Sequence, residues 1–230
     1  MNILLLSMPD SFEHMPSIVI RMPNGALTSL AGNVDAHHKV AVADLILEQR
    51  NVRPTVEKLV RELQPDVVGL SVMTFQRKTA FKIIALIRSL KPDVKVAVGG
   101  YDPSLACEPY MTEEAGVDCI VHGEGELTFR ELLRALEQGS SFETIPGLTY
   151  RADGTWRHNA SRPVHSLDGD EIRLPNRKAR VLSGFPAEHE PCPVGSDTAL
   201  EYALITHAEA RDPAVVARLD AVAGRVLRGN

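Results

Sequence analysis

The chain has 230 residues, of which 44% are hydrophobic and 24% charged, a composition typical of globular domains. A formal net charge of -5 gives no electrostatic basis for binding nucleic acid. No apolar run reaches the roughly 20 residues that a membrane-spanning helix requires, and the start lacks the basic region of a signal peptide. The three cysteines, Cys107, Cys119 and Cys192, form no CxxC pair, which predicts a reduced, cytoplasmic protein without a zinc or iron–sulfur site.

Short apolar runs alternate with helical patterns through the first 140 residues. Continuous apolar runs are typical of strands buried on both faces of a parallel sheet, and they occur at 2–7, 38–45, 66–72, 94–100 and 118–123. Helical patterns occur at 25–34, 53–65, 77–92, in the first part of 104–116, and at 124–139. This alternation predicts an α/β fold, a flavodoxin-like (Rossmann-like) doubly wound sheet of five parallel strands in the order 2-1-3-4-5.

The pattern changes after Gly139. Residues 147–159 carry Asp153-Gly154 between two short runs, which predicts a C-terminal β-hairpin. Residues 161–195 are polar, contain prolines and show no period, so we interpret them as a linker. Two amphipathic patterns then predict a helical tail. We therefore divide the chain into a cofactor-binding domain at 1–140, a hairpin and linker at 141–180, and a helical tail at 181–230.

Small residues gather where the predicted strands end. Ligands of open parallel sheets bind at this carboxyl edge. Gly99-Gly100 follow the fourth strand, and Gly123 and Gly125 follow the fifth, so a ligand can approach the backbone there. Residues 71–74 add small hydroxyl groups after the third strand. Such an edge suits a large flat or elongated ligand that lies across the strand ends.

Glu124 and Glu126 alternate with the glycines at the start of the fifth helix. Their charges argue against a phosphate at that helix N-terminus, and they suit amide or hydroxyl donors or the helix dipole itself. A purely structural role is the alternative, because strand-to-helix turns often need a glycine and early glutamates often complement a helix dipole.

Three other doubly wound functions fit poorly. A response regulator needs an aspartate at the end of the third strand, where this chain has Ser71-Val72-Met73. A dinucleotide-binding fold needs GxGxxG after the first strand, and "SMPDSFEHM" contains no glycine. The GxSxG elbow of serine hydrolases is absent from the sequence.

Three ordered motifs carry a resemblance to a known family: "PDVVGLSVMTFQ", "AVGGYDPS" and "AGVDCIVHGEGELTFRELL". In this order they resemble the cobalamin-binding N-terminal domain of cobalamin-dependent radical S-adenosylmethionine enzymes. The hairpin "IPGLTYRADGTW" and the later "SLDGDEIRLPNR" are similar to the segment that leads into the family's catalytic barrel. The resemblance covers residues 1–180 and implies a cobalamin-binding domain.

By this resemblance, the glycines make room for the dimethylbenzimidazole tail of cobalamin, and the carboxylates start the helix beside it. No catalytic residue is expected. The cofactor-binding residues that the resemblance implies are Pro9, Asp10, Ser71, Val72, Met73, Thr74, Gly99, Gly100, Tyr101, Gly123, Glu124, Gly125 and Glu126.

The lower axial position of cobalt has one candidate ligand. Many cobalamin domains carry DxHxxG after the first strand, where the histidine binds cobalt. Here Asp10 and His14 are four residues apart and the glycine is missing, so a solvated loop histidine is the alternative. The radical family commonly lacks the motif, and the resemblance therefore implies cobalamin without a protein histidine ligand. His122, beside the glycine–glutamate run, is either a ligand contact or a buried structural residue.

The family continues into a barrel whose CxxxCxxC cysteines hold a 4Fe–4S cluster. After Arg180 this chain has one cysteine, Cys192, and too few residues for a barrel, which needs about 200. No iron–sulfur cluster and no complete catalytic centre are therefore expected. Three functions stay open. The first is a cobalamin-binding module, either stand-alone or a truncated relative of the radical enzymes. The others are a cobalamin-carrying subunit for a separate radical or methyltransferase polypeptide, and a binder of another small molecule.

Overall fold

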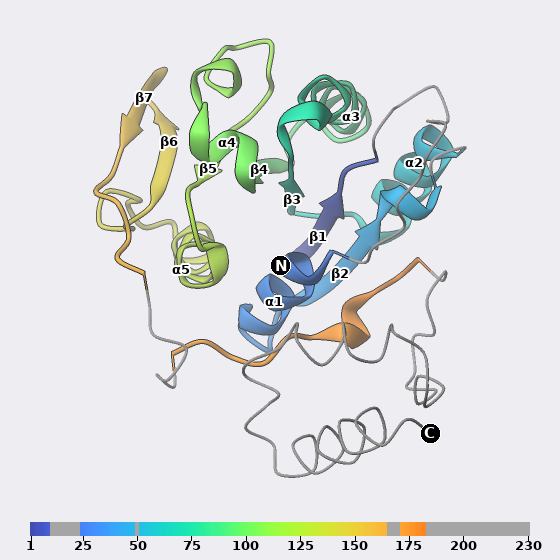
Figure 1. Cartoon of the computed structure of the whole chain (residues 1–230), viewed down its shortest axis with the longest axis horizontal. Helices are drawn as coiled ribbons and strands as arrows, with labels where there is room; N and C mark the ends of the chain where they lie inside the picture. The colour runs from blue at the N-terminus through green and yellow to red at the C-terminus, as the bar shows by residue number, and fades with distance from the viewer. Residues whose placement is uncertain (10–23, 49–50, 165–170, 183–230) are drawn as a thin grey trace, which may run out of the picture.

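The computed structural model describes residues 1–9, 24–48, 51–164 and 171–182. These residues form one sheet in the order β2-β1-β3-β4-β5-β6-β7, covered by helices (Figure 1). Its parallel strands are β1 (Asn2–Ser7), β2 (Lys39–Asp44), β3 (Val67–Ser71), β4 (Lys95–Gly99) and β5 (Cys119–Val121). The predicted doubly wound α/β fold and its 2-1-3-4-5 order are confirmed.

Helices cover both faces of the parallel strands. Two pack on one face, α1 (Gly25–Asn33) and α5 (Gly125–Gln138), and two on the other, α2 (Val52–Leu63) and α3 (Arg77–Leu90). Between β4 and β5 lies the short α4 (Tyr101–Leu105). It begins three residues before the predicted start because Gly100 turns the chain directly after β4. No helix of the described residues is long and apolar enough to cross a membrane.

Side-chain alternation along each strand builds two separate cores. Leu4 and Leu6 of β1 point to the core beneath α2 and α3, whereas Ile3 and Leu5 point to the core beneath α1 and α5. All four are at most 2% exposed. A strand buried on both faces must be apolar at every position, which explains the continuous apolar runs in the sequence.

The predicted hairpin extends the sheet. It consists of β6 (Leu148–Ala152) and β7 (Thr155–His158), and β6 pairs antiparallel with β5. The turn residues Asp153 and Gly154 both have positive φ, at 50° and 75°, as a tight two-residue hairpin requires. The sheet therefore has seven strands, where we expected five and a separate hairpin.

Part of the predicted linker has a defined place in the fold. Residues 171–182 lie along α1 and β2, where Asn176 N donates to Thr28 O at 2.8 Å and Val181 N donates to Val42 O at 2.9 Å. Gly32 allows this approach, because a Cβ there would lie 1.9 Å from Leu174 O. The predicted helical tail lies outside the described residues.

We expect Gly32→Ala to displace residues 171–182 from the domain. Alanine itself favours the helix by about 0.5–1 kcal/mol, so any loosening must come from the clash with Leu174. Hydrogen exchange measured by mass spectrometry should show faster exchange at the amides of Asn176 and Val181, with the amides of α3 as internal control. Unchanged exchange at these two amides would contradict the proposed packing.

Candidate functional site

A pocket of about 280 Å³ opens between α1 and α5 at the carboxyl edge of the sheet. Its floor is formed by the last residues of β3 and β4, which are small on this face. Gly69 lies opposite Ala97, and Ser71 lies opposite Gly99, in the register of the two strands. Because none of these four residues carries a large side chain, space remains above the strands that larger residues would fill.

Apolar side chains form the walls of the pocket. Leu27 and Leu30 come from α1, Phe129 comes from α5, and Val121 comes from β5. At the start of α5, a Cβ on Gly125 would lie 3.1 Å from Leu30 Cδ2 and would narrow the pocket. These walls suit a flat apolar group.

The mouth of the pocket is polar. Ser29 Oγ donates to Glu126 Oε1 at 2.7 Å and joins α1 to α5 there. On the floor side, Asn24 Nδ2 donates to Ser71 Oγ at 3.4 Å, while Asn24 Oδ1 accepts from Leu27 N and begins α1. The rim can therefore exchange hydrogen bonds with polar groups attached to an apolar ligand.

Gly100 has a backbone role at this edge. Its φ is +98°, and a Cβ would lie 2.9 Å from the N and O atoms of Val72. Only glycine lets the chain turn so close to the residue that follows β3. Substitution of Gly100 would therefore disturb the backbone itself, and Gly125 is the better position at which to test the pocket.

The structure brings most of the predicted site residues together. The pocket is lined by the predicted Ser71, Gly99, Gly100, Gly123, Glu124, Gly125 and Glu126. Val72 is fully buried on the opposite face, whereas Met73, Thr74 and Tyr101 are exposed at the same edge of the sheet. Pro9 is buried after β1, and Asp10 and His14 lie outside the described residues.

Several lining residues were not among the predicted site residues, including Gly69, Ala97, Leu30 and Phe129. A signal for Gly69 was present, because a glycine inside a strand often marks a close approach of a ligand or a second backbone. Ala97, Leu30 and Phe129 carry no such signal, since many buried strands and helices contain these residue types.

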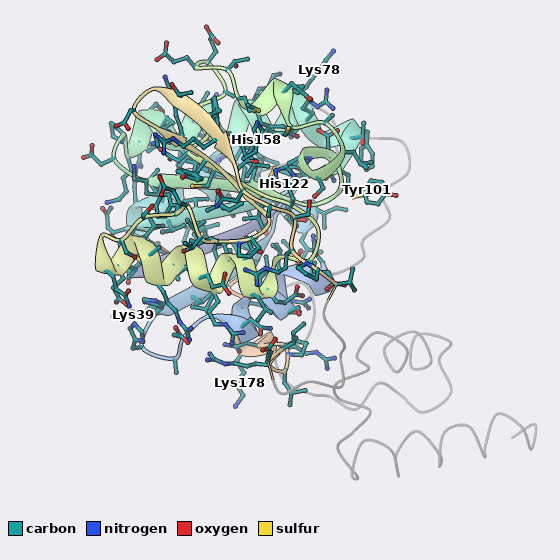
Figure 2. All side chains as sticks on the ribbon, turned by 90° about the vertical axis from the view of Figure 1, so that its left-hand side faces the viewer. Lys39, Lys78, Tyr101, His122, His158 and Lys178 are labelled. Carbon is teal, nitrogen blue, oxygen red and sulfur yellow. The ribbon has the colours of Figure 1, made fainter. Side chains whose placement is uncertain are left out.

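Large apolar side chains are exposed beside the pocket. Phe75 is 66% exposed, Tyr101 64% and Leu105 72%. They follow the ends of β3 and β4, and Figure 2 shows Tyr101 pointing away from the domain. These side chains are free to contact a ligand or a partner at this edge.

Asp102 anchors α4, the short helix after β4. Its buried carboxylate accepts hydrogen bonds of 2.6 Å from Arg77 Nε, from Arg77 Nη2 and from Tyr110 Oη. Burial alone would raise the pKa of Asp102, but the hydrogen bonds from Arg77 and Tyr110 outweigh it and lower the pKa. The short helix α4, which carries the exposed Tyr101, is therefore held by a charged pair whose carboxylate is buried.

Gln76 joins the loops after β1 and β3. Its buried side chain donates from Nε2 to Met8 O at 3.0 Å and accepts from Met73 N at 3.1 Å. The bond to Gln76 holds the backbone of Met73, whereas the Met73 side chain is 45% exposed at the edge of the sheet.

His122 lies within an internal hydrogen-bond network and does not line the pocket. Its Nε2 atom is 2.9 Å from Thr149 Oγ1, which is also 2.9 Å from His158 Nδ1 (Figure 2). Burial, and then the neighbouring His158, lower the pKa of His122. The arrangement supports the structural alternative for this residue, because the hydroxyl joins the end of β5 to the hairpin through His122 and the two hairpin strands to each other through His158.

A mostly parallel sheet with a glycine-floored pocket at its carboxyl edge is typical of Rossmann-like cofactor-binding domains. A family model described as "B12 binding domain" matches residues 17–133. The chain belongs to this B12-binding domain family.

Comparison with individual proteins relates the chain to larger enzymes. An uncharacterized methyltransferase of Pyrococcus horikoshii is 29% identical over 191 residues, which are 83% of this chain and 41% of the methyltransferase. The structure of the cobalamin-dependent S-adenosylmethionine radical enzyme OxsB with aqua-cobalamin and S-adenosylmethionine bound has a TM-score of 0.62 and 24% identity. It aligns with 76% of this chain and 24% of OxsB, and it shows the shared fold. The chain thus spans less than half the length of these relatives.

A relative of another kind matches a short stretch. S-methyl-5'-thioadenosine phosphorylase of Bradyrhizobium diazoefficiens is 69% identical over 51 residues, which are 22% of this chain and 18% of the phosphorylase.

We expect Asp102→Asn to destabilise the fold by about 3 kcal/mol, because it leaves Arg77 without its buried partner. The pKa of Asp102 is lowered in the folded state, so the charged pair stabilises fully above the unfolded pKa of about 3.9. This contribution is lost as the pH falls below that value. Urea unfolding of Asp102→Asn should therefore depend less on pH in the acid range than unfolding of the unsubstituted chain.

The exposed Asp93 provides the matched control. Asp93→Asn should leave the free energy of unfolding and its pH dependence nearly unchanged. Equal stability of the two variants would argue against the anchoring role of Asp102.

Proposed function

We propose that this chain binds cobalamin at the carboxyl edge of its sheet, with the nucleotide tail in the pocket between α1 and α5. The observation that carries the proposal is the floor of small residues, Gly69, Ser71, Ala97 and Gly99, at the point where the family's motifs lie. A flat aromatic base needs an apolar slot whose floor carries no large side chains, and this pocket provides one.

The polar groups around the pocket match the chemistry of the proposed ligand. Cobalamin carries amide groups around its ring and hydroxyl groups on its nucleotide tail. The carboxylates of Glu124 and Glu126 can accept from such donors, and Ser71 Oγ can donate to or accept from the ligand. The residues present therefore fit the cofactor.

The exposed apolar residues fit the flat ring. Phe75, Tyr101 and Met73 would offer apolar contact beside the pocket, while Gln76 and Asp102 hold their backbone in place. No described histidine lines the pocket. We propose binding without a protein histidine, and His14, which lies outside the described residues, is the position to test for cobalt ligation.

The chemistry that cobalamin supplies when bound is transfer of a methyl group or of electrons at cobalt. The part of this chain that we assign is binding and orientation of the cofactor. Two roles fit: a cobalamin-binding module, or a subunit that presents cobalamin to a separate radical or methyltransferase polypeptide. The second is supported by the radical enzymes among the relatives, of which the chain covers only a part.

The match to the phosphorylase covers 22% of this chain and 18% of the phosphorylase. We assign no phosphorylase activity to a stretch of this length, and the proposed cofactor role rests on the described domain.

The test of the proposal is corrinoid retention. Purified chain is incubated with hydroxocobalamin and desalted, and its absorption spectrum should show near-stoichiometric corrinoid. The band positions will show whether the nucleotide base has left cobalt, and His14→Ala should leave them unchanged. A colourless protein would favour another small-molecule ligand on the same fold.

We expect Gly125→Val to weaken corrinoid binding at least tenfold, which corresponds to about 1.4 kcal/mol. The new side chain would occupy the space beside Leu30. Leu30 can shift its flexible end, so the fold should persist. The measurement is hydroxocobalamin affinity by absorbance titration, and Ala85→Val on the exposed side of α3 is the matched control. Equal affinities of both variants would place the ligand elsewhere.

A further inference from the structure

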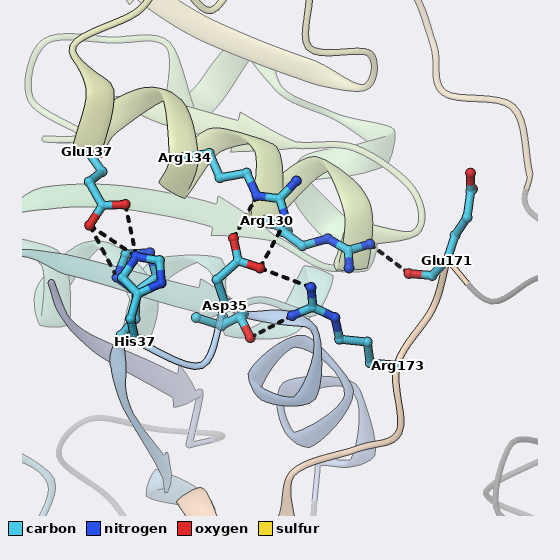
Figure 3. A network of polar contacts seen from close by, with 9 residues as sticks. Asp35, His37, Arg130, Arg134, Glu137, Glu171 and Arg173 are labelled. Atoms are coloured by element: carbon cyan, nitrogen blue, oxygen red, sulfur yellow. Dashed lines mark hydrogen bonds and ion pairs between the residues drawn. The ribbon is translucent and has the colours of Figure 1, made fainter.

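A cluster of metal-ligating side chains lies at the amino edge of the sheet, opposite the pocket. His37 and His38 precede β2, and Glu137 lies in the last turn of α5 (Figure 3). One potential ligand atom from each of the three residues lies within 4.8 Å of the others. Neither the fold family nor the proposed cobalamin site uses these residues.

The distances are close to those of a metal-bound set. His37 Nε2 lies 2.9 Å from Glu137 Oε2 and 3.1 Å from Oε1, and His38 Nδ1 lies 3.9 Å from Oε1. Ligand atoms around a tetrahedral zinc ion are about 3.3 Å apart, as bond lengths near 2.0 Å require. The His37–Glu137 pair already has this spacing, and a small movement of Glu137 would bring its other oxygen nearer to His38.

His38 contributes a buried imidazole to the cluster. Its side chain is 0% exposed, and its Nε2 atom has no hydrogen-bond partner. Its Nδ1 atom, on the side of Glu137, lies 3.1 Å from the amino group of Met1. A metal ion at Nδ1 would replace the contact with Met1.

Ion pairs hold the two halves of the cluster together. Asp35, two residues before His37, contacts Arg134 Nε at 2.6 Å and Arg173 Nη2 at 3.0 Å (Figure 3). Arg134 lies one helical turn before Glu137, so the turn that carries the histidines is fastened to the same face of α5. Arg173 Nη1 also donates to Val34 O at 3.2 Å. The turn that carries the two histidines is therefore held in place by these ion pairs and this hydrogen bond.

We propose that His37, His38 and Glu137 bind a divalent transition-metal ion of the zinc class. Two neutral imidazoles and one carboxylate are a common ligand set for such ions, and they leave further positions for water. The bound ion would fasten the turn after α1 to the end of α5. These are the two helices that wall the pocket, but the metal site is independent of the proposed cofactor function.

The test uses the full chain without a histidine tag, stripped with a chelator and dialysed. Isothermal titration with zinc chloride gives the number of bound equivalents. His37→Gln and Glu137→Gln are suitable variants, because both residues are exposed and substitution should leave the fold intact. Each should lose one equivalent, or weaken it at least tenfold, relative to the unsubstituted chain.

The matched control is His158→Gln, which removes an exposed imidazole outside the cluster. It should keep every equivalent, and any zinc bound elsewhere in the chain will be common to all four proteins. Cobalt(II) absorption provides a second readout, because ligation by two imidazoles should give visible bands that both cluster variants lose. Identical zinc stoichiometry and affinity in the cluster variants and the control would overturn the proposal.

Discussion

The missing side-chain volume on β3 and β4 is the constraint on which the rest of the site depends. On the face toward α2 and α3, Leu70 and Val98 fill the interior. On the other face, two residues of the same strands, Gly69 and Ala97, contribute one methyl group between them. A strand pair that is filled on one face and carries small residues at the carboxyl end of the other lets helices pack closely on the first face and leaves a slot at the end of the second.

α1 and α5 are joined by polar links as well as by the apolar core that they share. Polar links run along their junction, from Ser29–Glu126 at the mouth to Asp35–Arg134 near the amino edge. Exposed ion pairs stabilise by only about 0–1 kcal/mol each. Several such links in a row, with residues 171–182 packed along α1, hold the helices in position while the space between them stays open.

The sequence predicted the parallel sheet and its strand order because continuous apolar runs and helical periodicity are local signals. It also predicted the glycines of the pocket, since "GG" and "GEGE" stand at strand ends. Gly69 and Ala97 were missed because their importance depends on the register between β3 and β4, which joins residues 28 positions apart. Long-range pairing likewise decides that the hairpin extends the sheet beside β5.

The position of residues 171–182 also could not be predicted from the sequence. Their polar, irregular sequence carries no helical or strand period, and their position comes from single contacts such as Asn176 with Thr28. The approach is possible because Gly32 has no side chain. From the sequence alone, this glycine indicates only an interruption of the helical pattern of α1. Composition thus predicts the absence of regular structure but does not predict whether a segment is packed.

The carboxyl edge combines rigid backbone with exposed apolar side chains, and this combination bears on the choice between the proposed roles. Asp102 and Gln76 are buried and fully engaged, yet the neighbouring Tyr101 and Met73 are exposed. Holding these segments in one conformation costs conformational entropy, and their apolar side chains, which contact water, gain no burial that would offset this cost. A flat ligand lying on them would supply that burial on one side only. Its opposite side would then face outward, where a second polypeptide could reach the cofactor, as the carrier-subunit role requires.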